Sequence, residues 1–294
     1  MRGQEVRDMQ RRLILDEFSG RRTWGPSPSY PKVLSRSRPL RAEAMIVVAG
    51  PCSVENVGQA KAMAPELAKQ GVTFARGGVF RAGTYPRDEF GLRRGLARSW
   101  ARLCHVAGLK VVMECLDVRQ LDFMAGLADA IQVGARHMQD YVLLNEASKL
   151  KKPVFLKRAV GATLDEFLGA AEYLARGRCS PILIERGSAT HMNHVRWDVS
   201  LSLIAAIKRM AGLPILVDAS HGTGRRDLVE PVTLAGIAAG ADGFLVEVHA
   251  NPRRSVSDAD QAYPLSGLGA LISKARAVKA AVSVEYHECM GGAG

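Results

Sequence analysis

The sequence predicts an α/β protein of the (β/α)8 barrel class, the TIM barrel, preceded by a short N-terminal extension. From Met45 onward, eight apolar segments of strand length alternate with eight amphipathic segments of helical spacing, which favours a parallel barrel. The pattern G-x-G-x-x-G, typical of dinucleotide-binding sheets, does not follow the first apolar segment. The chain also lacks a Walker motif and a G-x-S-x-G motif. A doubly wound sheet is therefore the second choice.

Apolar runs give the expected strands, and helical periodicity gives the helices between them. The expected strands cover residues 45–51, 73–80, 110–116, 130–135, 153–159, 181–187, 214–219 and 243–249. The expected helices cover residues 56–70, 90–108, 119–128, 139–150, 163–177, 200–211, 227–239 and 267–283. The helix over 163–177 opens with Thr163 and has Glu166 three positions later, which is the spacing of a capping box.

The first 44 residues differ from the rest in composition. They are rich in arginine and proline and show little periodicity beyond a short helical pattern over residues 6–18. We interpret residues 1–44 as a basic N-terminal extension and residues 45–294 as one barrel domain that carries the catalytic site. A segment that simply wraps around the barrel is an equally good interpretation of residues 1–44.

Charge and cysteine content limit the possible partners and compartment. The formal net charge is +11, but no run of five lysines or arginines and no basic-aromatic ribbon occurs, so nucleic acid is not an expected partner. No apolar run reaches the ~20 residues of a membrane span, and the N-terminus lacks a hydrophobic signal core. The five cysteines form no C-x-x-C pair, which favours free thiols in a reducing cytoplasm.

The stretch over residues 213–229 is the most informative part of the sequence for locating a functional site. An apolar strand ends at Asp218, and a polar, glycine-containing turn with His221, Arg225 and Arg226 follows before helical periodicity resumes. Ligands of α/β folds gather at the carboxyl ends of the strands, so we expect this turn to form one wall of an active site.

Polar residues at the other strand ends fall into two groups. Cys52, His221, Glu247 and Asp258 form a mixed sulfur, nitrogen and oxygen set that suits a divalent metal ion such as Mn, Fe, Co or Zn. The second group is cationic and suits a small phosphate ester: Arg76, Arg81, Arg136, Lys157 and Arg186. Further polar residues at strand ends are Glu114, Arg158, Glu185 and His249, of which His249 is a candidate to support the metal ligands.

Several motifs together resemble one enzyme family. They are GPCSVE (50–55), IQVGAR (131–136), KKPVFLKR (151–158), ERG (185–187), DASHGTGRRDLV (218–229), GADGFLVEVH (240–249) and SDADQ (257–261). They resemble 3-deoxy-D-arabino-heptulosonate 7-phosphate (DAHP) synthases of the short type I-beta branch, which are related to 3-deoxy-octulosonate 8-phosphate synthases. The resemblance spans residues 45–270. It implies a cytoplasmic barrel enzyme that condenses phosphoenolpyruvate with erythrose 4-phosphate, in the shikimate pathway to the aromatic amino acids.

The resemblance also implies roles for individual residues. Cys52, His221, Glu247 and Asp258 would bind the divalent metal, which would act as a Lewis acid on the acceptor aldehyde. Phosphoenolpyruvate would be held by Arg76, Arg136, Lys157 and Arg186, with Arg81 where the family usually has lysine. Lys157 is our first candidate for proton transfer, and a metal-bound water near His221 is the other. The catalytic set is thus Lys157, His221 and Cys52.

The sequence departs from the family pattern on the acceptor side. Gly83 stands where the family has an arginine for the acceptor phosphate, while Thr84 and Arg196 remain candidates for substrate binding. Ser200 replaces an aspartate. Three hypotheses stay open: a DAHP synthase, a paralogue that uses a different aldehyde in a specialised pathway, and a catalytically weak barrel with a binding or regulatory role. The complete metal set argues against the third. By analogy we also expect a homo-oligomer.

Overall fold

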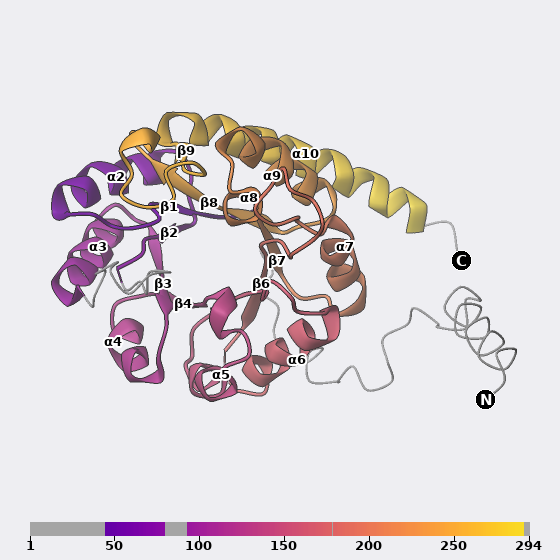
Figure 1. Ribbon diagram of the computed structural model, residues 1–294, viewed down its shortest axis with the longest axis horizontal. Helices are drawn as coiled ribbons and strands as arrows, with labels where there is room; N and C mark the ends of the chain where they lie inside the picture. Colours follow the sequence, from indigo (N-terminus) through magenta and orange to yellow (C-terminus); the bar gives the residue numbers. More distant parts are fainter. Residues whose placement is uncertain (1–44, 80–92, 178, 291–294) are drawn as a thin grey trace, which may run out of the picture. The chain divides into compact units, whose positions relative to one another are not determined.

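The computed structural model describes residues 45–79, 93–177 and 179–290, with side chains up to residue 282. The predicted N-terminal extension, residues 1–44, lies outside the described residues. The described part of the chain is a closed ring of parallel strands surrounded by helices (Figure 1). The predicted (β/α)8 barrel is therefore confirmed.

Each strand of the ring pairs in parallel with the next, and β1 pairs with β8 to close the barrel. The strands are β1 (Ile46–Gly50), β2 (Phe74–Arg76), β3 (Lys110–Cys115), β4 (Ala130–Val133), β5 (Val154–Lys157), β6 (Pro181–Glu185), β7 (Ile215–Asp218) and β8 (Gly243–His249). A two-residue strand, β9 (Tyr263–Pro264), adds to β8 in parallel. All eight predicted barrel strands are present, most of them shorter at one or both ends than predicted.

The helices cover the outside of the ring (Figure 1). They are α2 (Val57–Lys69), α3 (Arg94–Val106), α4 (Leu121–Ala125), α5 (Tyr141–Ser148), α6 (Leu164–Ala175), α7 (Leu201–Met210), α8 (Ala219–Thr223), α9 (Arg226–Ala238) and α10 (Leu268–Met290). The capping box of α6 is confirmed, since Thr163 and Glu166 each accept a backbone N–H of the other. The α10 helix continues seven residues beyond its predicted end at 283.

Two sequence-based expectations were wrong in detail. The predicted turn after Asp218 is the short helix α8, because the Asp218 carboxylate caps it by accepting the His221 N–H at 3.0 Å. The helix ends at Gly224, whose φ of +67° lies in the left-handed region. The predicted helix 119–128 is divided into a 3-10 turn, Val118–Gln120, and the short α4.

The barrel interior is filled by apolar side chains from all eight strands. This core cluster comprises Ile46, Val48, Phe74, Val112, Ala130, Phe155, Ile182, Ile184, Leu216 and Leu245. Within it, the rings of Phe74 and Phe155 meet edge to face, with centroids 5.2 Å apart. The core closes the barrel below the carboxyl ends of the strands, so a ligand site has room only above it.

Two further expectations concern thiols and membranes. The described cysteines, Cys52, Cys104, Cys115 and Cys179, are buried and are not joined in disulfides. Among the described residues, no helix has both the length and the apolar character that crossing a bilayer requires.

Candidate active site

The polar side chains of the candidate site lie directly above the apolar core. Side chains alternate between the faces of a strand, so a residue two positions after an inward-facing one also faces inward. The core residues and the polar residues that follow them at this spacing are Phe74 and Arg76, Val112 and Glu114, Phe155 and Lys157, Ile184 and Arg186, Leu216 and Asp218, and Leu245 and Glu247. Strand alternation therefore directs these polar groups from six strands to one end of the barrel.

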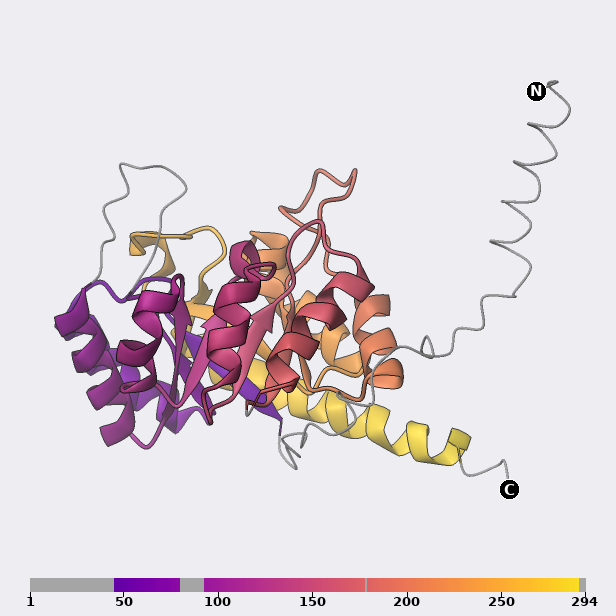
Figure 2. The same ribbon diagram turned by 90° about the horizontal axis from the view of Figure 1, so that it is seen from below.

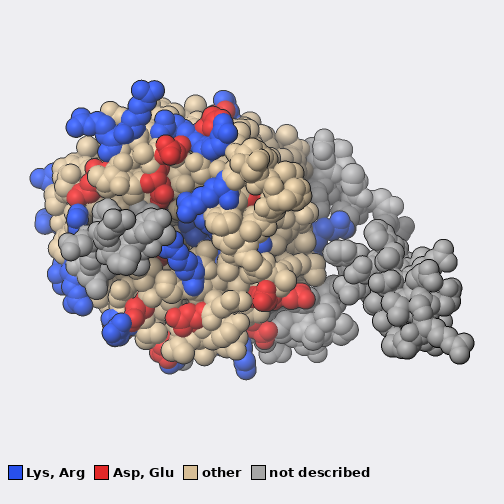
Figure 3. Space-filling view, viewed as in Figure 1, with Lys and Arg blue, Asp and Glu red and all other residues tan. Residues whose placement is uncertain are grey.

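A cavity of about 490 Å³ opens at this end. It is lined by all the sequence-predicted site residues within the described part of the chain: Cys52, Arg76, Arg136, Lys157, Arg186, Arg196, His221, Glu247 and Asp258. Lysine and arginine side chains gather around the middle of this face (Figure 3). Arg81, Gly83 and Thr84 lie outside the described residues.

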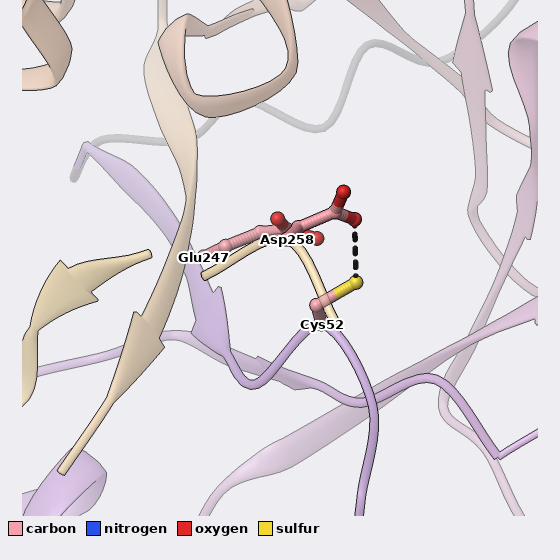
Figure 4. Close-up of side chains that lie close together, drawn as sticks. All are labelled: Cys52, Glu247 and Asp258. Carbon is pink, nitrogen blue, oxygen red and sulfur yellow. Dashed lines mark hydrogen bonds between the residues drawn. The ribbon is translucent and has the colours of Figure 1, made fainter. Parts of the chain in front are cut away.

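Three candidate metal ligands converge at the edge of the cavity. The ligand atoms of Cys52, Glu247 and Asp258 all lie within 4.8 Å of one another. The Cys52 thiol donates a hydrogen bond to Asp258 Oδ2 at 2.9 Å (Figure 4). His221, the fourth predicted ligand, borders this group through its Nε2 atom, 3.1 Å from Glu247 Oε1.

The chemistry of this group fits a divalent transition metal. A thiolate, an imidazole and two carboxylates are ligands that Mn, Fe, Co and Zn accept. Cys52 and Glu247 are buried, and Asp258 is half-buried. Anionic groups this close together repel one another once ionised, and a divalent cation compensates that repulsion. The residues present therefore fit the metal that the sequence predicts.

A second cluster joins Asp218, His221 and Lys157. Asp218 Oδ2 lies 2.8 Å from His221 Nδ1 and 2.9 Å from Lys157 Nζ. Burial raises the pKa of Asp218, but the charges of His221 and Lys157 outweigh it and hold that pKa well below its usual value. For His221, burial lowers the pKa, but Asp218 and Glu247 raise it above its ordinary value. Asp218 thus fixes the orientation of both cavity-facing side chains.

Glu247 is held from three sides, by His221, Arg76 and Gln261. Its Oε1 accepts Arg76 Nη1 at 2.5 Å, and its Oε2 accepts Gln261 Nε2 at 2.5 Å. Burial raises the pKa of Glu247, but the charges of His221 and Arg76 lower it by more. The pKa of Glu247 therefore lies well below its ordinary value. For Arg76 the directions are reversed: burial lowers its pKa, but the charges of Glu247 and Cys52 raise it by more, so the pKa of Arg76 lies above its ordinary value. Glu247 is accordingly a preoriented carboxylate.

The cations of the cavity lie close enough to influence one another. Burial lowers the pKa of Arg186, Asp218 opposes this, and the charges of Arg196 and Arg136 lower it further. With Lys157 on the same lining, these groups create a positive potential in a partly enclosed space. Such a cluster stabilises a small ligand with more than one negative charge.

The loop between β6 and α7 forms one wall of the cavity and projects from the barrel (Figure 2). Its returning part is bound to α8, because the Arg196 N–H donates to Thr223 O at 2.9 Å and the Trp197 N–H donates to Gly222 O at 2.7 Å. A Cβ atom at Gly222 would lie 2.4 Å from Val199 Cγ2. Glycine at position 222 therefore allows the loop to pack against the helix that carries His221.

Ser200, one of the departures from the family pattern, has a structural role. It is the N-cap of α7, and its Oγ accepts the Leu203 N–H at 3.3 Å. Serine and aspartate cap helices about equally well. The replacement of aspartate by serine therefore preserves the cap of α7.

Arg158 and Glu185 face away from the cavity, toward the helices. Arg158 Nε lies 2.5 Å from Glu185 Oε2, and its Nη2 donates to Glu185 Oε1 at 2.8 Å. Glu185 also accepts the backbone N–H groups of Gly187 and Ser200, at 3.0 and 3.1 Å. This buried pair fastens β5 to β6 and to the start of α7.

His249, the candidate support for the metal ligands, contacts a neighbouring loop. Its Nε2 lies 3.3 Å from Glu55 Oε1 and 3.0 Å from Gln59 Nε2. Glu55 in turn accepts the Val256 N–H at 3.2 Å, two residues before Asp258. These contacts link His249 to the loop that carries Asp258.

Sequence reasoning missed three residues of the site: Asp218, Gln261 and Trp197. Asp218 carried a usable signal, because it lies three residues before His221, at the spacing of an N-cap to the third helical residue. Gln261 lies in the SDADQ motif, but nothing in that motif indicates that its side chain reaches Glu247. Trp197 lines the cavity from a loop without periodicity, so its position depends on tertiary contacts.

Comparisons with known proteins give consistent results. The DAHP synthetase I family matches residues 41–282 of the chain. A relative named phospho-2-dehydro-3-deoxyheptonate aldolase, from Thermotoga maritima, is 38% identical over 242 residues, which cover 82% of this chain and 72% of the relative. A relative named 2-dehydro-3-deoxyphosphooctonate aldolase, from Desulfotalea psychrophila, is 28% identical over 258 residues, covering 81% of this chain and 91% of the relative.

Solved structures give the same result. The structure of phospho-2-dehydro-3-deoxyheptonate aldolase (DAHP synthase) from Thermotoga maritima is 38% identical with a TM-score of 0.77, over 81% of this chain and 70% of that one. A truncated form of 3-deoxy-D-arabino-heptulosonate 7-phosphate synthase from the same organism is 36% identical with a TM-score of 0.74, over 81% of this chain and 87% of that one. These likenesses extend over most of the chain.

Proposed function

The chain belongs to the DAHP synthetase I family, and from this we propose that it condenses phosphoenolpyruvate with erythrose 4-phosphate to give DAHP and phosphate. It would thus serve aromatic amino acid biosynthesis. The observation that carries the proposal is the single cavity at the carboxyl ends of the strands. Its lining holds the candidate metal ligands on one side and Arg136, Lys157 and Arg186 on the other.

The reaction joins two substrates and releases phosphate. The enol C3 of phosphoenolpyruvate attacks the aldehyde carbonyl carbon while water adds at C2. The tetrahedral phosphohemiketal then collapses by cleavage of its C–O bond to phosphate. Negative charge persists on the phosphate and carboxylate throughout, which is why a preorganised set of cations favours the reaction.

The side of the cavity that carries Arg136, Lys157 and Arg186 is the proposed site for phosphoenolpyruvate. Arg136, Lys157 and Arg186 provide guanidinium and ammonium donors in one cavity, and Arg76 stands beside them, paired with Glu247. Arg81 is proposed to complete this set from sequence alone, and Arg196 and Thr84 to contact the substrates. Such donors hold the phosphate and carboxylate in register for attack by C3.

The proposed metal ligands are Cys52, His221, Glu247 and Asp258. The sulfur and oxygen atoms within 4.8 Å of one another, with His221 against Glu247, support this assignment. A divalent ion bound there supplies Lewis-acid activation of the acceptor aldehyde. Asp218 contributes by directing His221 toward Glu247, since it holds the Nδ1 side of the imidazole ring.

Lys157 is the proposed proton donor. Its ammonium group is buried at the cavity wall and lies 2.9 Å from Asp218 Oδ2 and 3.4 Å from His221 Nδ1. These contacts hold Nζ in one position, from which a proton can pass to a substrate oxygen. Asp218 lies between Lys157 and His221, so its negative charge compensates the positive charge on Lys157 before the proton is transferred.

A second candidate function differs only in the acceptor. Gly83 has no side chain to bind the phosphate of erythrose 4-phosphate, so a paralogue that joins phosphoenolpyruvate to another aldehyde is the alternative. Beside the main cavity, a second one of about 300 Å³ shares Arg196 and Asp258 with it and is also lined by His194 and Arg225. Its polar lining offers donors and acceptors to a hydroxylated acceptor.

The experiment that tests both is an assay of phosphate release from phosphoenolpyruvate. It uses a panel of aldehydes, phosphorylated and not, with and without a chelator. Rapid, chelator-sensitive release with erythrose 4-phosphate supports the main proposal, and rapid release with a different aldehyde supports the alternative. No metal-dependent turnover with any aldehyde would refute both and leave a binding or regulatory barrel.

We further propose that the enzyme works as a homo-oligomer in the cytoplasm. The free thiols of the described residues support a reducing compartment, because oxidation of Cys52 would remove a metal ligand. Light scattering of the purified enzyme tests the first point, and fractionation of its source cells tests the second.

A further inference from the structure

Arg186 is a buried cation without an ion-pair partner among the described residues. Its exposed fraction is 7%, and no carboxylate oxygen of the described chain lies within 4.0 Å of its guanidinium nitrogens. Like charges on Arg136 and Arg196 stand near it. A guanidinium group in such a position keeps its N–H donors for an incoming anion, but it needs another contact to fix its plane.

Trp197 provides that contact. The guanidinium carbon of Arg186 lies over the Trp197 ring, 5.8 Å from the ring centroid, and both residues line the 490 Å³ cavity. An ion pair with a carboxylate would occupy the N–H groups of the arginine and neutralise its charge. Contact with an aromatic face does neither, so the donors at the edge of the guanidinium plane stay free for a ligand.

The backbone around Trp197 is bound both to the end of β6 and to α8. Ser188 and Asp198 exchange two backbone hydrogen bonds of 3.0 Å, which fold the loop back toward the end of β6. The Trp197 N–H donates to Gly222 O in α8. Gly187 has φ of +91°, and a Cβ atom there would lie 2.7 Å from Trp197 Cβ. These contacts fix the backbone and Cβ of Trp197 beside the end of β6, which places its ring next to Arg186.

We propose that Trp197 is a positioning residue for the donor substrate: its ring holds the Arg186 guanidinium so that the N–H groups face an anionic group of phosphoenolpyruvate. This inference rests on the proposed function, because it takes phosphoenolpyruvate as the anion. Trp197 itself is not a proton donor in this scheme. It acts through Arg186, and its indole reports on whether that arginine has bound an anion.

Two substitutions test the proposal. Trp197→Leu removes the aromatic face, and Trp197→Phe restores a smaller one. We expect the KM and the directly measured Kd for phosphoenolpyruvate to rise about 5- to 30-fold in Trp197→Leu, and less in Trp197→Phe. The kcat should stay within about threefold, because the arginine is retained and saturating substrate reorders it.

The split between KM and kcat is the readout that a purely structural role of Trp197 would not produce, and fluorescence tests whether the indole lies at the bound anion. Titration of the wild-type enzyme with phosphoenolpyruvate, and separately with inorganic phosphate, should alter the tryptophan emission. Trp197→Phe should lose this change while calorimetry still detects binding. Should Trp197→Leu fail to fold in a thermal melt, this comparison with the Phe variant decides the question.

Phe123→Leu is the matched control. Phe123 in α4 lies under two guanidinium groups, those of Arg94 at 4.9 Å and Arg98 at 5.2 Å, away from the cavity lining. Losing this arginine-aromatic contact should leave the KM for phosphoenolpyruvate unchanged.

The outcomes separate the inference from the proposed function. If the wild-type enzyme binds phosphoenolpyruvate and both Trp197 variants bind it with unchanged Kd and KM, the positioning role is refuted while the proposed function stands. An unchanged fluorescence response in Trp197→Phe refutes it as well. If the wild-type enzyme neither binds nor turns over phosphoenolpyruvate, the proposed function fails, and the inference fails with it.

Discussion

Ser257 Oγ donates a hydrogen bond to Ser53 Oγ at 2.9 Å, although the two residues are 204 positions apart in the chain. Beside this pair lies the contact between the Cys52 thiol and Asp258 Oδ2, also at 2.9 Å. The loop after β1 and the loop after β8 therefore meet in antiparallel order, with residue 52 against 258 and residue 53 against 257. Two of the proposed metal ligands are brought together by this alignment.

Asp258 has a backbone conformation that requires such support. Its φ of +50° lies in the left-handed region, which is unfavourable for a residue with a Cβ atom. A conformation of this kind costs about 1–3 kcal/mol and persists only where its surroundings hold it. Contacts on both sides hold it: the serine pair and the contact of Glu55 with the Val256 N–H, at 3.2 Å, precede it, and the Gln261 and Ala262 N–H groups donate to Asp258 O at 3.2 and 3.1 Å.

Ser257→Ala should therefore weaken metal binding while all four proposed ligands are kept. Loss of a residue that orients a ligand typically costs about 10- to 100-fold in metal affinity. The measurement is calorimetric titration of the metal-free enzyme with Mn²⁺ or Co²⁺ in the absence of substrates.

Ser202→Ala is the control for Ser257→Ala. It removes another serine-serine contact, that of Ser200 Oγ and Ser202 Oγ at 3.3 Å, from the exposed start of α7. Its metal affinity should equal that of the wild type. Equal affinities in both alanine variants would contradict the orienting role of Ser257.

Lys157→Met should reduce turnover far more than it reduces stability. The methionine fills a similar volume but offers no proton and leaves the charge of Asp218 unbalanced. We expect a loss of about 10²- to 10⁴-fold in kcat. Steady-state kinetics at saturating phosphoenolpyruvate, with circular dichroism as a check of folding, measures it.

Lys149→Met serves as its counterpart, since Lys149 forms an exposed pair with Glu146 at 2.5 Å on the surface of α5. That variant should turn over at the wild-type rate. A Lys157→Met enzyme with more than about a tenth of wild-type kcat would exclude Lys157 as the proton donor.

Glu185→Ala should destabilise the fold strongly, because it leaves Arg158 buried without a carboxylate to balance its charge and two backbone N–H groups without an acceptor. Breaking a buried pair from one side costs about 3–5 kcal/mol. The double variant Arg158→Met/Glu185→Leu should recover part of that loss, because no unpaired charge remains. Urea unfolding followed by circular dichroism measures the free energies of unfolding, and a single variant within 1 kcal/mol of wild type would contradict this account.

Tyr263 gives the fold a dependence on high pH. Burial and the hydrogen bond from its hydroxyl to Glu230 Oε2, at 2.9 Å, raise the pKa of Tyr263 from 10.0 to about 12. The folded state thus favours the neutral phenol. The resulting stabilisation is complete below pH 10 and disappears as the pH rises toward 12.

The Tyr263→Phe variant removes this titration. The difference in free energy of unfolding between the wild type and Tyr263→Phe should be about 0.5–1.5 kcal/mol near neutral pH. It should shrink above pH 10, where the wild type loses its advantage. A difference that grows with pH in this range would show that the sign is wrong.

Much of the barrel was readable from the sequence because parallel strands buried on both faces are continuous apolar runs. The segment that became β8 was predicted to its exact bounds, since Gly243 and His249 enclose a run that is apolar except for Glu247. The segment around α8 was not, because its helix depends on one cap. Asp218 stands at the spacing of a cap for His221, but one capping residue at the end of a strand is a weak signal for a helix of only five residues.

The candidate site shows the same division. Strand alternation could anticipate that Arg76, Lys157 and Glu247 reach one end of the barrel, because the period of two is local. The neighbours of Trp197 and Gln261 depend on how long loops fold back, and loops carry no such period. The serine pair could not be predicted, because it joins two loops from opposite ends of the barrel sequence.

The alternation of side chains along a strand gives neighbouring residues different surroundings: one faces the cavity and the next faces the helices. At the end of β5, Lys157 faces the cavity and the next residue, Arg158, faces the helices; at the end of β6, Glu185 faces the helices and the next residue, Arg186, faces the cavity. Deleting or inserting a single residue within either strand would exchange the side chain that faces the cavity with the one that faces the helices. Such a change would remove a cation from the cavity and break the buried pair in one step, so the barrel tolerates changes of length in its loops rather than in these strands.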